Sequence, residues 1–181
     1  LDGLPFDIYS VNVHTGAKRL IGRSYRTAPK WSVNGKWAVM YDPIAQVWNK
    51  FDGATGKVVN ISDAIGYPMF MESYDKPAPA PAYGIAGWTA DGNNVFLYDA
   101  YDWWKIDLTG ERQPECLTKG YGRKHGKSIR KMTSNIDKDV FQKDEKVIVS
   151  LWDKDTMDEG VYQLDMKGRL RKLMEGNYVY T

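Results

Sequence analysis

The sequence carries a recurring pattern in which a Trp and a hydroxyl residue come before a Gly turn and an apolar strand. The two copies are Trp31-Ser32-Val33-Asn34-Gly35 and Trp88-Thr89-Ala90-Asp91-Gly92. Asn-Gly and Asp-Gly accept positive φ at both positions of a two-residue turn, so each copy predicts a hairpin between antiparallel strands. A pattern that recurs at this length indicates repeated β units.

A second repeat joins two strands through an Asn or Asp, a Gly and a basic residue. Its four copies lie within residues 8–18, 47–57, 103–112 and 161–169. A regular series of such hairpins is typical of the four-stranded antiparallel blades of a β-propeller. We therefore expect an all-β fold.

The two repeats together predict one partial propeller over residues 1–181, with about three to four four-stranded blades. The expected parts are outer strands at 6–22 and blades near 28–61, 85–117 and 129–174. The central strands 38–41, 95–98 and 147–152 are nearly continuous apolar runs, which predicts that adjacent blades cover both of their faces. No segment has a convincing helical pattern.

Residues 62–84 contain Pro68, Pro77, Pro79 and Pro81. Proline lacks the amide donor that a helix or a central strand requires, so this segment is expected to be a long loop between blades. It is a surface loop stiffened by its prolines, or a loop with a docking or gating role.

Charge and hydropathy exclude several classes of partner. The 25 basic and 23 acidic residues are interspersed, which predicts no nucleic-acid surface. The sequence has no apolar run long enough to span a bilayer and no visible signal peptide. Because the chain opens at Leu1 in strand-like sequence, we expect its natural start to lie upstream.

Catalytic and metal-binding motifs are missing from the sequence. It has no Gly-x-Ser-x-Gly elbow, His14 falls in an expected turn, and His125 falls in a run of basic residues. Residues 153–160 fail the spacing of a calcium loop, and the single Cys116 is expected to pack rather than react. We therefore expect no cofactor, no metal and no catalytic residue.

Three segments carry a resemblance to a known family. They are Tyr83–Trp88, which follows the prolines of 77–81, then Tyr98–Asp107 and Leu117–His125. The chain resembles the N-terminal propeller of prolyl oligopeptidase family serine peptidases, in the dipeptidyl-peptidase-like branch common in Bacteroidetes. The likeness extends over nearly the whole chain, and the block from Tyr83 to Lys124 is its most specific part.

The resemblance implies a parent serine peptidase in which the propeller caps an α/β-hydrolase domain and admits only short peptides or unstructured chain ends. The partners would be that hydrolase domain and the peptide substrates, and the location would be periplasmic or otherwise exported. This chain alone would not be an enzyme, because the family's catalytic residues lie on the hydrolase domain. The candidate partner or chamber contacts are Tyr83, Trp88, Tyr101, Trp103, Trp104, Arg123 and Lys124.

Other interpretations remain open. A stand-alone scaffold that resembles the TolB-type periplasmic propellers and binds a protein partner would have the same repeats. A glycan-binding or glycan-cleaving propeller is a third option, supported only by the aromatic content. An open arc of blades also exposes strand edges, which predicts self-association or a fourth blade assembled from residues 6–22 and a C-terminal strand at 178–180.

Overall fold

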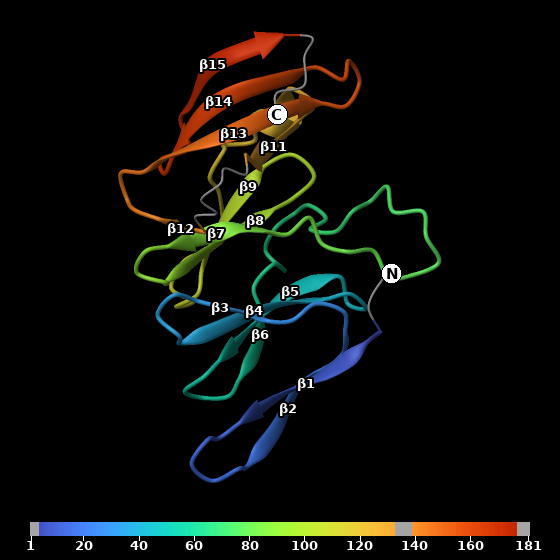
Figure 1. Ribbon diagram of the computed structural model, residues 1–181, viewed down its shortest axis with the longest axis vertical. Coiled ribbons are helices and arrows are strands. Elements are labelled where there is room, and N and C mark those ends of the chain that lie inside the picture. Colours follow the sequence, from blue (N-terminus) through green and yellow to red (C-terminus); the bar gives the residue numbers. More distant parts are fainter. Residues whose placement is uncertain (1–3, 133–138, 177–181) are drawn as a thin grey trace. The chain divides into compact units, whose positions relative to one another are not determined.

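A computed structural model describes residues 4–132 and 139–176, and within these ranges the fold is all-β (Figure 1). Fifteen strands form four sheets, accompanied by one four-residue helix. The all-β class expected from the repeats is confirmed. The strand expected at 178–180 lies outside the described residues. Leu1–Ala82 and Tyr83–Thr181 form two compact units.

The first unit contains a hairpin and a four-stranded antiparallel sheet. The hairpin pairs β1 (Phe6–Val11) with β2 (Lys18–Tyr25). The sheet has the order β3-β4-β5-β6, with β3 (Lys30–Trp31), β4 (Trp37–Asp42), β5 (Val47–Asp52) and β6 (Val58–Asn60). These strands fall where the sequence places the outer strands 6–22 and the blade 28–61.

Strand β4 is the buried centre of this unit. Residues 37–41 are all buried, as expected from their continuous apolar run. On one face Ala38 and Met40 pack against Phe51 and, across to the hairpin, against Ile8 and Tyr25. The Tyr41 hydroxyl donates a hydrogen bond to the Ala80 carbonyl at 3.0 Å, which holds the proline-rich segment 62–82 against β4.

The Trp-hydroxyl-Gly pattern forms hairpin turns, but not the two-residue turns that we predicted. Only Gly35 takes a positive φ, of 68°, while Asn34 does not. The Ser32 hydroxyl instead donates to Asn34 Oδ1 at 2.8 Å and accepts the Trp37 amide at 3.1 Å. Thr89 repeats both bonds, with Asp91 and Asn94 as its partners. The hydroxyl residue is therefore needed to close a wider turn.

A second type of turn recurs in four hairpins of the part of the chain that the structure describes. The side chain of an Asn or Asp accepts the backbone amides two and three residues later, and the fifth residue has a positive φ. The four turns are Asn12–Gly16, Asp42–Gln46, Asp52–Gly56 and Asp153–Met157. The segment that superficially resembles a calcium loop is thus one more copy of this turn.

The second unit contains two sheets. The first has the order β10-β9-β8-β7-β12, with β7 (Ile85–Thr89), β8 (Asn94–Tyr98), β9 (Trp103–Asp107), β10 (Glu115–Cys116) and β12 (Val140–Phe141). The second has the order β11-β13-β14-β15, with β11 (Lys127–Lys131), β13 (Lys146–Asp153), β14 (Glu159–Asp165) and β15 (Leu170–Gly176). Helix α1 (Tyr121–Lys124) lies between β10 and β11.

Strand β12 departs from the expected arrangement. It lies within residues 129–174 but joins the preceding sheet, where it pairs in parallel with β7. Gly87 permits this approach, because a Cβ atom there would come within 2.5 Å of the Phe141 ring and 2.7 Å of the Asp139 carbonyl oxygen. The 85–117 sheet therefore has five strands instead of the four expected.

The two sheets of this unit share one core, which contains Phe96, Trp103, Ile129, Leu151 and Leu164 among others. Trp103 joins them directly, since its indole N–H donates to the Ile129 carbonyl at 3.1 Å. Strand β13 differs from expectation, because Val147 and Val149 are buried whereas Ile148 between them is 40% exposed. Its second face is uncovered in the described residues, so only one sheet face is buried.

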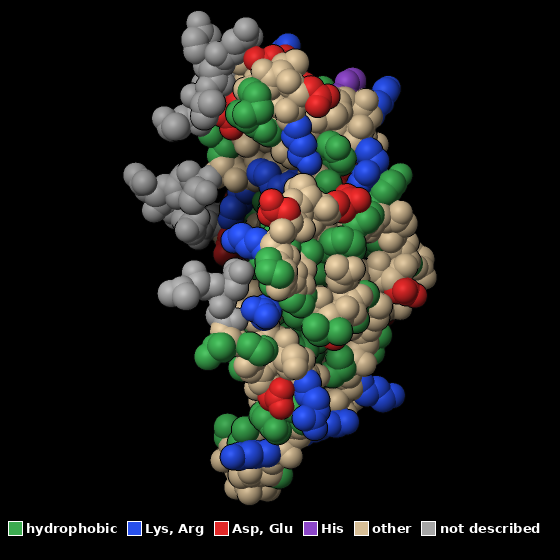
Figure 2. Space-filling model, turned by 90° about the vertical axis from the view of Figure 1, so that its right-hand side faces the viewer, with side chains coloured by type: hydrophobic (Ala, Val, Ile, Leu, Met, Phe, Trp, Pro, Cys, Tyr) green, Lys and Arg blue, Asp and Glu red, His purple; other side chains and the backbone are tan. Residues whose placement is uncertain are grey.

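Among the described residues no helix has the length and apolar character needed to cross a membrane. Both basic and acidic side chains are spread over the face shown in Figure 2.

Candidate functional site: the Asp99–Asp102 loop

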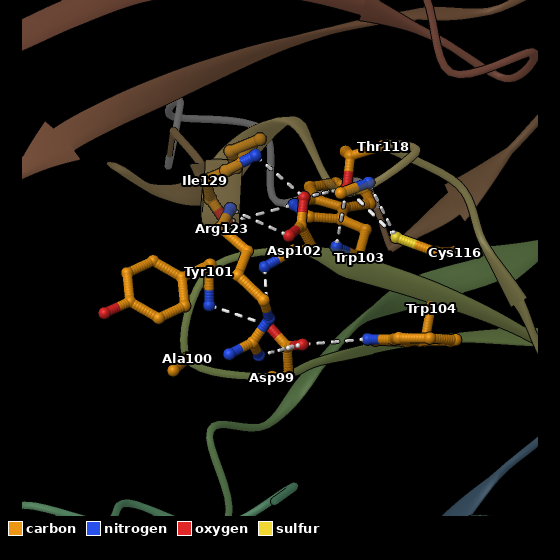
Figure 3. Close-up of polar contacts among 12 residues, drawn as sticks. Asp99, Ala100, Tyr101, Asp102, Trp103, Trp104, Cys116, Thr118, Arg123 and Ile129 are labelled. Carbon is orange, nitrogen blue, oxygen red and sulfur yellow. Dashed lines mark hydrogen bonds and ion pairs between the residues drawn. The ribbon is translucent and has the colours of Figure 1, made fainter. Parts of the chain in front are cut away.

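The loop between β8 and β9 is built around two buried carboxylates, Asp99 and Asp102, which are 0% and 1% exposed (Figure 3). Asp99 Oδ1 accepts the backbone amides of Tyr101 and Asp102 at 2.7 and 2.6 Å. Asp99 Oδ2 accepts the Trp104 indole N–H at 3.0 Å and an Arg123 Nη2 hydrogen at 2.9 Å. Four donors thus fix this carboxylate and the loop that carries it.

Asp102 connects the same loop to the segment around α1. Its Oδ1 atom accepts the Thr118 hydroxyl at 2.6 Å and the Gly122 amide at 2.9 Å, and its Oδ2 atom accepts the Arg123 amide at 3.0 Å. Gly122 is needed here because a Cβ atom would lie 2.6 Å from the Tyr101 carbonyl oxygen. The Asp102 carboxylate therefore closes the loop onto α1.

Arg130 supports the loop from β11. Its Nη2 atom donates to the carbonyl oxygens of Asp99 and Ala100, at 2.7 and 3.2 Å. Its guanidinium lies 4.7 Å from the ring centroid of Tyr98 and 5.4 Å from that of Tyr83. Burial lowers the pKa of Arg130 from its ordinary value. Carbonyl oxygens and aromatic rings together compensate the buried cation.

Tyr101 is the surface element of this arrangement. Its ring centroid lies 5.0 Å from Arg123 Cζ and 4.9 Å from Lys154 Nζ, and Lys154 comes from the turn between β13 and β14. In Figure 3 the Tyr101 hydroxyl points away from the two carboxylates. The half-buried Tyr101 ring therefore lies next to two cations, and the hydrogen bond to Asp99 fixes the Tyr101 backbone.

The residues expected from the sequence to contact a partner fall into different environments. Trp103 and Trp88 are 0% and 6% exposed and belong to the interior, so they offer no surface for a partner in this structure. Trp104 is half-buried and serves as a donor to Asp99. The remaining candidates, which are not fully buried, are Tyr83, Tyr101, Arg123 and Lys124.

Sequence reasoning missed the carboxylates and the second cation of the site. Asp99, Asp102 and Thr118 lie in segments that carry the resemblance, but the sequence assigns no site role to them, to Arg130 or to Lys154. One signal was present, because Asp99 and Asp102 follow a buried strand and are followed by Trp103 with no turn Gly between them. Acidic residues next to a core tryptophan require buried donors.

The two carboxylates of the loop are engaged by donors of the protein itself. Asp99 and Asp102 accept these hydrogen bonds from backbone amides and from the side chains of Trp104, Thr118 and Arg123, and the bond from Arg123 is also an ion pair. Cys116 Sγ accepts the Gly120 amide at 3.2 Å, and burial raises the pKa of this thiol. Within residues 4–132 and 139–176, no three His, Cys, Asp or Glu side chains are grouped to hold a metal ion.

No family model matches the chain, and no curated protein matches it.

Proposed function

We propose that this chain is a non-catalytic β-propeller segment of a prolyl oligopeptidase family serine peptidase. In that role it scaffolds an α/β-hydrolase domain of the parent protein and restricts the access of peptides to it. The proposal places the parent protein in the periplasm or another exported location.

The observation that carries the proposal is the stacking of two consecutive sheets in the second unit. Each contains a run of antiparallel strands in chain order, and the two bury a common core. Trp103 hydrogen-bonds from one sheet to Ile129 of the other. Consecutive antiparallel sheets packed face to face are the repeating element of propellers, which supports the proposed propeller.

A second line of support comes from the segment that resembles the family. The block Tyr83–Lys124 contains Asp99, Asp102, Arg123 and Tyr101, so the most specific part of the resemblance coincides with this buried polar network. A rigid loop with an accessible aromatic ring suits the recognition of a peptide at a chamber wall.

The test is to identify the native protein that contains this sequence. An antibody raised against the purified chain would capture that protein from its source cells, which would then be treated with a fluorophosphonate probe that labels active serine hydrolases. We expect a captured protein several hundred residues longer than 181 that takes up the probe. The purified chain alone is expected to take up none and to hydrolyse no dipeptide substrate.

Capture of an unlabelled protein no longer than this chain would overturn the peptidase assignment and favour the stand-alone scaffold. Labelling or hydrolysis by the purified chain would contradict its non-catalytic role.

A further inference from the structure

Strand β1 differs from three other strands of the chain because one of its edges has no partner. The strands β1, β5, β9 and β14 each lead into an Asn or Asp whose side chain accepts the backbone amide two residues later, so these residues align the four strands: Asn12, Asp52, Asp107 and Asp165. Strands β5, β9 and β14 pair with a neighbour on both sides. Among the described residues, β1 pairs only with β2 (Figure 1).

The unpaired edge of β1 presents the backbone groups of Tyr9 and Val11. The Asn12 amide donates to the Ala17 carbonyl at 2.9 Å, so the backbone of Asn12 faces β2. Successive residues of an antiparallel strand direct their N–H and C=O groups to opposite sides, so Tyr9 and Val11 face away from β2. A strand edge of this kind can pair with a further strand.

The Val11 side chain is exposed, whereas its counterparts in the aligned strands are buried. Val11 is 49% exposed, and the residue just before the aligned Asp is at most 2% exposed in the other three strands: Phe51, Ile106 and Leu164. Tyr9, two residues before Val11, is 52% exposed. In the part of the chain that the structure describes, β1 therefore lacks both the edge partner and the burial that this position has in the other sheets.

The strands paired with the three counterparts indicate which strand would complete β1. All three run antiparallel to their partners and carry two buried, non-aromatic apolar side chains, one at the position opposite Val11 and one at the position opposite Tyr9. These pairs are Ala38 and Met40 in β4, Val95 and Leu97 in β8, and Val147 and Val149 in β13.

We infer that the free edge of β1 binds an antiparallel strand with non-aromatic apolar side chains opposite Tyr9 and Val11, and that a further part of the parent protein supplies this strand. The chemistry of the strand is inferred from the three counterpart sheets alone. Its source rests on the proposed function, in which the chain is a segment of a longer protein.

The test is a titration of the ¹⁵N-labelled chain with acetyl-Lys-Trp-Ala-Val-Met-Tyr-Asp carboxamide, which has the sequence of residues 36–42. We expect saturable shifts of the Tyr9 and Val11 amide signals in ¹H–¹⁵N correlation spectra. In β4 the Ala38 backbone faces β5 and the Val39 backbone faces β3. A peptide N-methylated at the Ala38 position should therefore bind about tenfold more weakly, because it loses a hydrogen bond to β1. The peptide N-methylated at the Val39 position is the matched control and should bind like the unmodified peptide.

Variants of the chain test the same edge from the other side. Val11→Pro removes the amide that faces the free edge, and proline is tolerated where an edge amide faces solvent, so binding should weaken about tenfold in a chain that still folds. Val11→Thr keeps the amide and a branched side chain and should bind within about twofold of the parent. Thermal unfolding shows whether each variant is folded, and the pair of methylated peptides tests the edge without changing the chain.

No saturable shift with any peptide, or equal binding of the peptides methylated at the Ala38 and Val39 positions, would overturn the inference. Sedimentation that shows a dimer of the chain, dissociated by Val11→Pro, would assign the edge to a second copy and overturn the proposed source. A longer native protein that takes up no fluorophosphonate would contradict the peptidase assignment alone.

Discussion

Thr118 donates its hydroxyl hydrogen to the buried carboxylate of Asp102 at 2.6 Å, although 16 residues separate them in the chain. The same Thr118 oxygen accepts the backbone amide of Trp103 at 3.1 Å. This pair therefore connects the start of β9 to the segment that leads into α1. Thr118 thereby links the polar network of the loop to the buried Trp103.

Removal of the Asp102 carboxylate should destabilise the second unit strongly. Asp102→Ala leaves the Thr118 hydroxyl and two backbone amides without their acceptor, and unsatisfied buried donors cost about 1–3 kcal/mol each before relaxation. We expect the free energy of unfolding to fall by about 3 kcal/mol. Urea unfolding followed by tryptophan fluorescence measures the loss. Asp155→Ala, at an exposed turn position, is the control, and an equal effect of both would contradict the assigned role of Asp102.

Met157 should be replaceable by glycine with a gain in stability. It has a φ of 63° at the position that Gly16 and Gly56 occupy in the matching turns. A left-handed conformation costs a residue with a Cβ atom about 1 kcal/mol relative to glycine. Met157→Gly should raise the free energy of unfolding by about that amount. Gly16→Ala should lower it similarly, because a Cβ atom there meets nothing within 4 Å and only the backbone strain remains.

Asn34 should tolerate aspartate but not alanine. Its Oδ1 atom accepts the Ser32 hydroxyl and the Lys36 amide, as Asp91 does with Thr89 and Asn93 in the second copy. The pKa of Asp91 lies below its ordinary value, mainly because Asp91 accepts the Thr89 hydroxyl and to a smaller extent because it accepts the Asn93 amide. Thermal unfolding should show Asn34→Asp within about 0.5 kcal/mol of the parent and Asn34→Ala about 1 kcal/mol less stable. Equal losses would mean that the side-chain oxygen has no role in the turn.

Glu175 should contribute to acid sensitivity. Hydrogen bonds from Lys127, at 2.6 Å, and Lys172, at 3.0 Å, lower the pKa of Glu175 to about 2. Because the pKa is lowered in the folded state, its contribution is complete above the ordinary value near 4.5 and is lost as pH falls toward 2. The contribution should stay below about 1 kcal/mol, because solvent screens the pair. Glu175→Gln should make the free energy of unfolding depend less steeply on pH across this range. An unchanged pH dependence would contradict the role of Glu175.

The repeats predicted the all-β class and the positions of several hairpins, although not the type of turn, because these signals are local. The Asn12 and Asp52 hairpins depend on hydrogen bonds between residues a few positions apart, which a sequence pattern reports directly. The parallel pairing of β12 with β7 depends instead on the missing Cβ atom of Gly87, far away in the chain. The local pattern of apolar and polar residues does not indicate which distant strands pair.

The candidate site was only partly predictable for the same reason. Tyr101 and Arg123 were identified through the resemblance, but Lys154 reaches Tyr101 from a hairpin of the other sheet. The burial of Trp103 likewise depends on the packing of two sheets. Aromatic residues near a conspicuous motif are candidates for both a surface and a core, and only tertiary packing decides between them.

The central structural claim is that the two sheets of the second unit pack against each other and that Trp103 of one sheet hydrogen-bonds to the other. The most direct measurement is the NMR signal of the Trp103 indole proton. We predict slow exchange with solvent, because this N–H is bound to Ile129, and nuclear Overhauser contacts to Ile129 and Phe141. A rapidly exchanging indole proton without these contacts would contradict the stacked sheets.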